Sequence, residues 1–217
     1  MTEDVARLYL ITPASFGISD FAGRLRAILD GFDIACVRMA LSTVSEDDLA
    51  RASDALRAVC DPRDVPLVVN DHFRLVERLG LDGVHLTDGA RQVRAARKLL
   101  GPDAIVGAHA RTSRHDGMTA GEIGVDYVSF GPVSSSALGD GEHAPVDLFE
   151  WWSELIEIPV VAEGGVTPEI ARQLAGVTDF VAIGDEAWTH PKGEATALRE
   201  IISALSRPFQ DSEILRG

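Results

Sequence analysis

The chain has 217 residues, 46% of them hydrophobic and 25% charged, with a formal net charge of −14. This size and composition fit one globular α/β domain. The acidic balance argues against nucleic acids and anionic membranes as partners, and no apolar run approaches the length of a membrane span. An acidic amino terminus without a signal-peptide pattern predicts a cytoplasmic protein, in which Cys36 and Cys60 are reduced thiols.

Short apolar runs alternate strictly with helical patterns along the chain. Continuous apolar runs bounded by turns are typical of strands that are buried on both faces of a parallel sheet. The predicted strands cover 8–11, 34–39, 66–69, 84–86, 105–108, a run within 124–133, 160–162 and 180–183. The predicted helices cover 21–29, 46–60, 72–79, 90–100, 117–123, 146–156, a segment that opens at 168, and 195–205.

Two of the predicted helices begin with a recognisable cap. Ser45 precedes three acidic residues, which favour the amino-terminal end of a helix dipole. Thr167 precedes Pro168, and proline is well tolerated at the first helical position.

A Gly-x-Asp pattern recurs before every second predicted strand. The copies are 31–37, 80–86, 124–130 and 176–183, roughly 45 to 55 residues apart, which indicates a repeated supersecondary unit. Eight strand–helix units with this repeat predict a closed (β/α)8, or TIM, barrel over residues 1–206, followed by a polar tail at 207–217. An open doubly wound sheet is the alternative, but no Gly-x-Gly-x-x-Gly fingerprint follows the first strand.

Polar residues gather where the predicted strands end, and active sites of this fold lie at those ends. Glycines after the last two strands would let backbone N–H groups approach a phosphate. Asn70-Asp71 offers oxygen ligands for Mg²⁺ or, alternatively, caps the next helix. The full set is Arg38, Asn70, Asp71, His85, Asp88, His109, Arg111, Gly131, Glu163, Gly164, Gly165, Gly184 and Asp185.

Two of these residues leave alternatives open. An inward Arg38 would be costly without an anionic partner, which is either a substrate phosphate or a permanent partner such as Glu163 or Asp71. His109 is a general acid or base, because its ordinary pKa lies near neutrality, or a structural histidine hydrogen-bonded within the rim.

Five segments together resemble thiamine phosphate synthase and its relative, the thiazole tautomerase. The resemblance extends from Leu8 to about Leu205, in the same order and register as in that family. The segments read Leu-Tyr-Leu-Ile-Thr at 8–12, Val-Asn-Asp at 69–71, Asp-Gly-Val-His-Leu at 82–86, Asp-Tyr-Val-Ser-Phe-Gly-Pro-Val at 126–133, and Pro-Val-Val-Ala-Glu-Gly-Gly-Val at 159–166.

The resemblance implies an Mg²⁺-dependent transfer in which hydroxymethylpyrimidine diphosphate is joined to a thiazole phosphate and pyrophosphate is released. Arg38, Asn70, Asp71 and Gly165 match family positions for diphosphate, metal and phosphate. Together with the rim positions, we expect Arg38, His109 and Arg111 to be catalytic and Asp71 and Asp88 to bind Mg²⁺. We expect substrate or phosphate contacts from Asn70, His85, Gly131, Ser136, Glu163, Gly164, Gly165 and Gly184.

Several positions depart from the family pattern. The lysine after the second strand is Ala40, and the Thr-x-Thr-Lys loop becomes 134–139 without a lysine. The second metal carboxylate falls on Ala90, with Asp88 two residues early. The apolar residue before Gly-Gly is Glu163, the serine after the fifth strand is His109, the serine after the eighth strand is Asp185, followed by Glu186, and the tautomerase histidine aligns with Arg111.

Three hypotheses follow from this balance of matches and departures. The first is a synthase-type enzyme with a rearranged site, and the second is a tautomerase-like enzyme in which His109 carries the proton and Glu163 orients it. The third is a non-catalytic paralogue that binds a phosphorylated metabolite or a partner protein. Whether the chain forms a homo-oligomer is not readable from the sequence.

Overall fold

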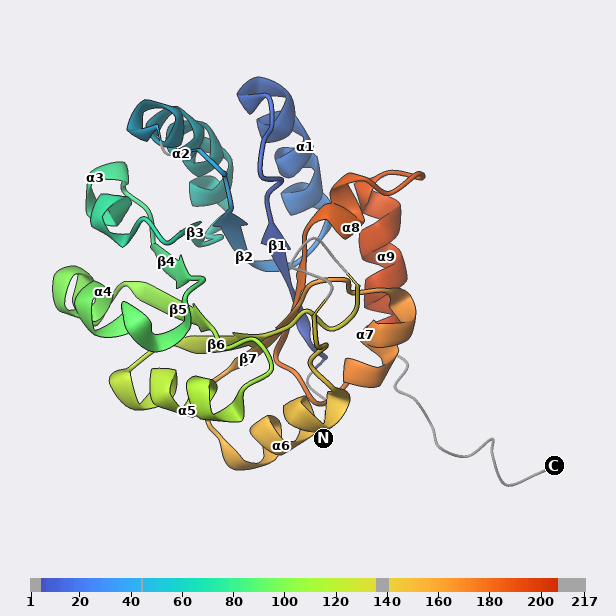
Figure 1. Ribbon diagram of the computed structural model, residues 1–217. Helices are drawn as coiled ribbons and strands as arrows, with labels where there is room; N and C mark the ends of the chain where they lie inside the picture. Colours follow the sequence, from blue (N-terminus) through green and yellow to red (C-terminus); the bar gives the residue numbers. More distant parts are fainter. Residues whose placement is uncertain (1–4, 44, 136–140, 207–217) are drawn as a thin grey trace.

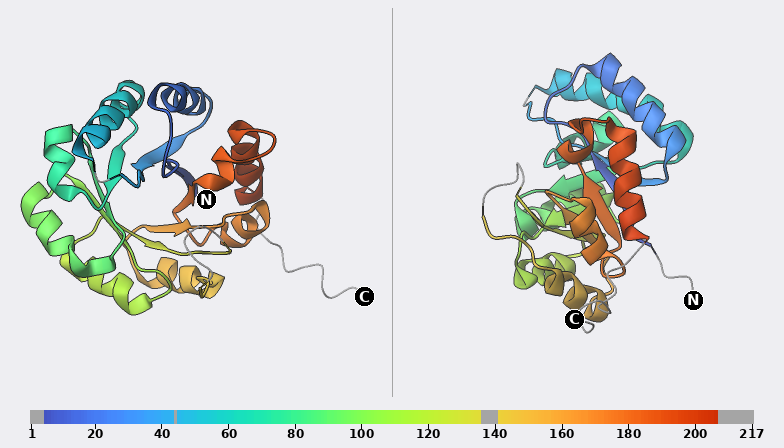
Figure 2. Two further views of the ribbon diagram at one scale, coloured as in Figure 1. Left: turned by 45° about the horizontal axis from the view of Figure 1, so that its top comes forward. Right: turned by 90° about the vertical axis from the view of Figure 1, so that its right-hand side faces the viewer.

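Eight parallel strands close into a barrel in chain order, with β8 pairing back to β1. The computed structural model describes residues 5–43, 45–135 and 141–206. Helices surround the strands on all sides, as seen down the barrel in Figure 1 and in the two turned views of Figure 2. The predicted single-domain TIM barrel is confirmed. The predicted tail lies outside the described residues.

The strands and helices follow one another as predicted, with one addition. The strands are β1 (Arg7–Ile11), β2 (Ile34–Met39), β3 (Leu67–Asn70), β4 (Gly83–Leu86), β5 (Ile105–His109), β6 (Tyr127–Phe130), β7 (Val160–Glu163) and β8 (Phe180–Ile183). The helices are α1 (Ile18–Gly31), α2 (Glu46–Cys60), α3 (Val76–Leu79), α4 (Val93–Leu100), α5 (Arg114–Ile123), α6 (Val146–Leu155), α7 (Pro168–Leu174), α8 (Asp185–Trp188) and α9 (Glu194–Leu205).

The expectation of eight helices was wrong, because α8 follows β8 directly. Four residues are too few to display helical periodicity, so the sequence did not reveal it. The predicted helices at 72–79 and 90–100 each begin as a short 3-10 turn, Phe73–Leu75 and Gly89–Arg91. No helix among the described residues is long and apolar enough to cross a membrane.

Both predicted helix caps are confirmed. The side chain of Ser45 accepts a hydrogen bond from the backbone N–H of Asp48 at the start of α2. The side chain of Thr167 accepts one from the N–H of Ile170, and Pro168 occupies the first turn of α7. These bonds satisfy donors that have no partner within the helix.

The Gly-x-Asp repeat ties neighbouring strands together at the amino-terminal end of the barrel. Asp82, Asp126 and Asp179 precede β4, β6 and β8, and each accepts a hydrogen bond from a backbone N–H at the start of the preceding strand. The N···O distances are 2.7 Å from Leu67, 2.7 Å from Val106 and 2.8 Å from Val160. The looser copy differs, since Asp33 pairs with Arg7 on β1 instead. The repeat is therefore structural and lies opposite the predicted site.

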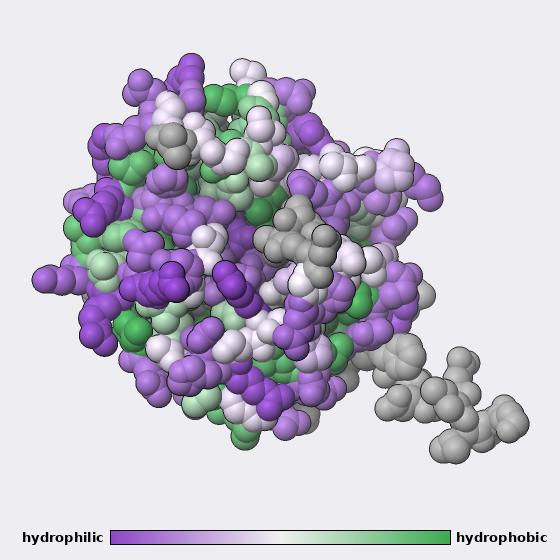
Figure 3. All heavy atoms as spheres, viewed as in Figure 1, coloured by the Kyte–Doolittle hydropathy of each residue, from purple (hydrophilic) through white to green (hydrophobic). Residues whose placement is uncertain are grey.

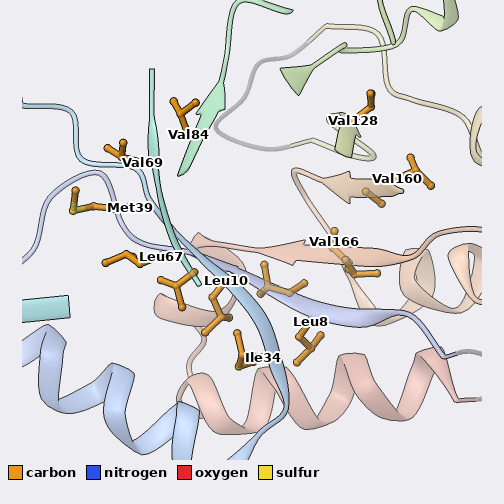
Figure 4. Close-up of a cluster of buried hydrophobic side chains, with 14 of the residues drawn as sticks. Leu8, Leu10, Ile34, Met39, Leu67, Val69, Val84, Val128, Val160 and Val166 are labelled. Carbon is orange, nitrogen blue, oxygen red and sulfur yellow. The ribbon is translucent and has the colours of Figure 1, made fainter. Parts of the chain in front are cut away.

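The hydrophobic core lies mainly between the strands and the helices. Leu8, Leu10, Ile34, Val84 and Val160 belong to this layer, and Figure 4 shows such side chains around the strands. Cys36 and Cys60 are buried and free, as predicted.

A second, smaller cluster fills the interior of the barrel. It consists of Tyr9, Cys36, Val68, Tyr127, Val161 and Ala182, from six different strands. Gly107 on β5 makes room for it, because a Cβ at that position would overlap the ring of Tyr127. The barrel therefore has an apolar floor beneath the mouth.

Replacing Gly107 with alanine should lower the free energy of unfolding by at least about 1–3 kcal/mol, the usual cost of overpacking a filled core. Gly23→Ala is the matched control, because Gly23 lies on α1 with nothing within 4 Å of an added Cβ. That change should be neutral or stabilise the protein by up to about 1 kcal/mol. Urea unfolding of both variants tests this, and equal effects would contradict the packing argument.

Candidate functional site

Each polar residue of the mouth follows, two positions along its strand, a residue that points into the barrel at the level of the apolar floor. Side chains on a strand alternate between the two faces, so positions two apart point the same way. Val161 in the floor is therefore followed by Glu163 at the mouth, and Tyr127 by Ser129. The remaining pairs are Cys36 with Arg38, Val68 with Asn70, and Gly107 with His109.

Glu163 is the centre of a buried polar network that joins four strands. Its Oε1 lies 2.7 Å from Nδ1 of His109 and accepts a hydrogen bond of 3.2 Å from Oγ of Ser129. Its Oε2 lies 2.8 Å from Nη2 of Arg38. Both members of this ion pair are almost fully buried, with exposed fractions of 4% for Arg38 and 1% for Glu163. The structure thus pairs Arg38 with Glu163, not with Asp71.

The network keeps a full charge deep in the protein. Burial alone would raise the pKa of the Glu163 carboxyl, but the charge of Arg38 and the hydrogen bond from His109 outweigh it, so this pKa lies well below its usual range. Burial would likewise lower the pKa of Arg38, and the Glu163 charge more than reverses this. A buried ion pair of this kind is sustained by mutual compensation.

A second buried chain of hydrogen bonds holds His85. The hydroxyl of Tyr127 lies 2.8 Å from the hydroxyl of Tyr9 and 2.9 Å from Nδ1 of His85. Burial, followed by the charge of Arg38, holds the pKa of His85 well below its usual range. His85 is therefore a neutral histidine inside the barrel.

Asp71 and Asp88, the two predicted metal ligands, differ in how many of their carboxylate oxygens already accept hydrogen bonds. Asp71 accepts hydrogen bonds from the backbone N–H and the hydroxyl of Thr87, at 2.7 Å and 2.6 Å. Asp88 accepts one from Gln92 through Oδ2, while its buried Oδ1 has no hydrogen-bond partner among the described residues.

Within the described ranges, no group of three or more His, Cys, Asp or Glu side chains could hold a metal ion. Mg²⁺ commonly takes only one or two carboxylates from the protein and its other ligands from substrate phosphates and water. The orphaned oxygen of Asp88 and the neighbouring carboxylate of Asp71, at the ends of adjacent strands, fit that mode of binding.

The polar residues line two separate hollows of the mouth. A cavity of about 200 Å³ lies over β1, β2 and β8, and another of about 340 Å³ lies over the ends of β4 and β5. Arg38, Asn70, Gly164 and Gly184 line the first, with Asp185 and Glu186. Asp88, His109 and Arg111 line the second, with Arg91 and Asp116. Hydrophilic residues gather over the middle of the face drawn in Figure 3.

Backbone donors after β7 and β8 converge on a single side chain, Glu186. Its Oε1 accepts from the N–H groups of Gly165 at 2.6 Å and Val166 at 3.3 Å. Its Oε2 accepts from the N–H of Gly184 at 2.8 Å. We call these three N–H groups the anion cradle. The predicted phosphate glycines Gly165 and Gly184 thus do face one point, and a carboxylate of the chain itself occupies it.

The remaining predicted residues lie around this arrangement. Gly131 packs against the backbone carbonyl of Glu163, where a side chain would not fit, and its N–H donates to the carbonyl of Arg111. Ser134 donates to the carbonyl of Gly165, which joins the loops after β6 and β7. Ser136 lies outside the described residues.

Sequence reasoning missed Ser129, Thr87 and Glu186 as parts of the mouth. Ser129 was visible in the motif at 126–133, two residues after Tyr127, and the period of two would have placed it inward. The contacts of Thr87 with Asp71 and of Glu186 with Gly165 and Val166 join segments 16 to 21 residues apart, so no local pattern revealed them. The sequence showed Glu186 as an acid after the eighth strand, but not its bond to the nearby N–H of Gly184.

Comparisons with known proteins find relatives along nearly the whole chain. A profile of the thiamine monophosphate synthase family (TMP-TENI) matches residues 8–186. The chain belongs to this family. It is 41% identical to a thiamine-phosphate synthase of Rhodospirillum centenum over 196 residues, which cover 89% of this chain and 95% of that protein. It is 38% identical to one of Erythrobacter litoralis over 94% of this chain and 98% of that protein.

A solved structure supports the fold of this family member independently. The thiamine phosphate pyrophosphorylase of Pyrococcus furiosus superposes with a TM-score of 0.79, covering 94% of this chain and 97% of the other, at 21% identity. The resemblance drawn from the sequence motifs is thereby confirmed for the family and for the barrel.

Arg38→Met should lower the free energy of unfolding by about 3–5 kcal/mol, because it leaves the Glu163 charge buried without its cation. The double variant Arg38→Met/Glu163→Leu should recover most of that loss, since a buried pair replaced by apolar residues of similar volume is often neutral. Urea unfolding in a double-mutant cycle measures the coupling. Additive losses would show that the two side chains are not compensating each other.

The pKa of His85 predicts a loss of stability in mild acid. Its folded pKa lies below the ordinary 6.5, so the unfolded chain binds the proton more readily and stability falls as the pH drops below about 6.5. Glu163 adds a further loss only below its ordinary 4.5. Urea unfolding between pH 8 and pH 5 should show this slope, and His85→Asn should flatten it. An unchanged slope in that variant would assign the effect to other groups.

Proposed function

We propose that the chain is a thiamine phosphate synthase, which joins hydroxymethylpyrimidine diphosphate to a thiazole phosphate and releases pyrophosphate. The observation that carries the proposal is the likeness to thiamine-phosphate synthases along nearly the whole chain. The mouth supplies cations, carboxylates and backbone donors suited to phosphorylated ligands. A cytoplasmic location belongs to the proposal, because such charged substrates do not cross a bilayer unaided.

In this proposal the diphosphate occupies the hollow over β4 and β5. Arg91 and Arg111 line that hollow together with Asp88, and about 340 Å³ is within the usual range for small-molecule sites. Both arginines face negative charge that grows on the leaving pyrophosphate, which is where fixed cations lower a barrier most. They take over the role of the absent family lysines.

Asp88 and Asp71 would hold Mg²⁺ beside the diphosphate. When bound, the ion would neutralise part of the charge on the leaving group. Arg38 contributes differently from expectation, because its charge is offset by Glu163. Its role is to keep Glu163 ionised and in place, and through Glu163 to orient His109.

A second candidate function is proton transfer by His109, as in the tautomerase branch of the family. The specific observation is the 2.7 Å contact between Nδ1 of His109 and Oε1 of Glu163. This contact holds the imidazole ring in one orientation and does not involve its second nitrogen, Nε2. A histidine oriented by a buried carboxylate on the wall of a cavity has the arrangement of a general acid or base.

The purified chain, given both substrates and Mg²⁺, should release pyrophosphate and form thiamine phosphate in equal amounts. Asp88→Asn should lower kcat/KM by about 10²-fold or more, the usual effect of losing one electrostatic contact to a transition state. Asp103→Asn is the control, because Asp103 is exposed in a turn before β5. Pyrophosphate and product are measured in parallel.

Failure to form any product with both substrates saturating would reject the synthase activity. Deuterium from the solvent entering the thiazole ligand without pyrophosphate release would instead support the His109 candidate. Equal activity of the Asp88 and Asp103 variants would remove Asp88 from the site while leaving the reaction standing.

A further inference from the structure

The anion cradle already holds an anion that belongs to the chain. All three hydrogen bonds of the Glu186 carboxylate come from backbone N–H groups, two in the loop after β7 and one after β8. Among the described residues no cationic side chain pairs with Glu186 within 4.0 Å. Its contacts are therefore those that an oxyanion of a ligand would make.

We propose that Glu186 is an internal substitute for phosphate, which must leave the cradle before a phosphorylated ligand binds there. A carboxylate offers two acceptor oxygens to backbone donors, and a phosphate group offers three to the same donors. The two cannot share the cradle, because like charges at contact distance repel strongly at a partly buried site. Glu186 thus sets the affinity of this end of the mouth for phosphate.

The surroundings make the exchange feasible. Glu186 is only half-buried, on the short helix α8 at the wall of the smaller cavity. Released from the cradle, its charge would move into water instead of into the core, so the side chain can be displaced without leaving a buried charge unpaired. The volume of about 200 Å³ also falls short of a usual ligand site while Glu186 is in place.

The neighbouring Asp185 provides a control that distinguishes occupation of the cradle from a general effect of negative charge. It lines the same cavity and carries the same charge, but it is exposed and its carboxylate makes no hydrogen bond to the cradle among the described residues. If Glu186 acts by occupying the donors, removing Glu186 and removing Asp185 will have different effects on phosphate binding.

The test is titration of inorganic phosphate into the full chain by calorimetry, with Glu186→Ala, Glu186→Gln and Asp185→Ala compared with the unaltered protein. If the cradle is vacant in about one molecule in ten, its apparent affinity for phosphate is reduced about tenfold. Glu186→Ala should therefore tighten binding by about tenfold or more. Asp185→Ala should change it by less than about twofold, because the exposed Asp185 carboxylate accepts a hydrogen bond from none of the three N–H groups and is screened by water and salt.

Glu186→Gln covers the case in which the alanine variant does not fold. It keeps the shape of the side chain, removes the charge and should give an intermediate gain in phosphate affinity. Thermal unfolding gives a second readout, because phosphate should raise the Tm of the Glu186 variants more than that of the unaltered chain. No gain in either Glu186 variant, or an equal gain in Asp185→Ala, overturns the proposal.

The inference rests on the proposed function only for the identity of the natural ligand. Inorganic phosphate reports on the cradle without turnover, so failure of the synthase assay leaves this test intact. Conversely, a chain that forms thiamine phosphate while Glu186 has no influence on phosphate binding would retain its function and lose only this inference.

Discussion

The mouth of this barrel depends on one buried negative charge. Glu163 would be too costly to keep ionised in the interior on its own, yet Arg38, His109 and Ser129 reach it from three other strands. Each of those partners is thereby fixed as well: Arg38 cannot turn towards a ligand without abandoning Glu163, and His109 presents one defined ring edge. One carboxylate therefore positions the side chains of three neighbouring residues.

Much of the architecture could be read from the sequence, because buried parallel strands leave short apolar runs and capped helices leave Ser45 and Thr167-Pro168 in view. The sequence left open whether Arg38 and Glu163 point into the barrel, and it offered a substrate phosphate, Glu163 or Asp71 as the partner of Arg38; the structure pairs Arg38 with Glu163. Contacts across loops could not be read. Glu186 reaches Gly165 through space, and the turn of helix that carries it is too short to leave a pattern.

The two hollows of the mouth differ in the charge of the side chains that line them. The one over β4 and β5 has arginines beside carboxylates, while the one at β8 is lined by Asp185 and Glu186. The Glu163 network lies between the two hollows. It adds no net charge there, because the charges of Arg38 and Glu163 cancel each other. A molecule with a net charge of −14 can therefore still attract an anion to the arginines of the hollow over β4 and β5.

The aspartates that precede β4, β6 and β8 have a consequence for the whole barrel. They join β3 to β4, β5 to β6 and β7 to β8 at the amino-terminal ends of the strands, opposite the mouth. These bonds involve none of the residues at the mouth, so the strands are held at one end by contacts that a ligand bound at the other end does not touch. The alignment of the strands and the chemistry of the mouth thus depend on different sets of side chains.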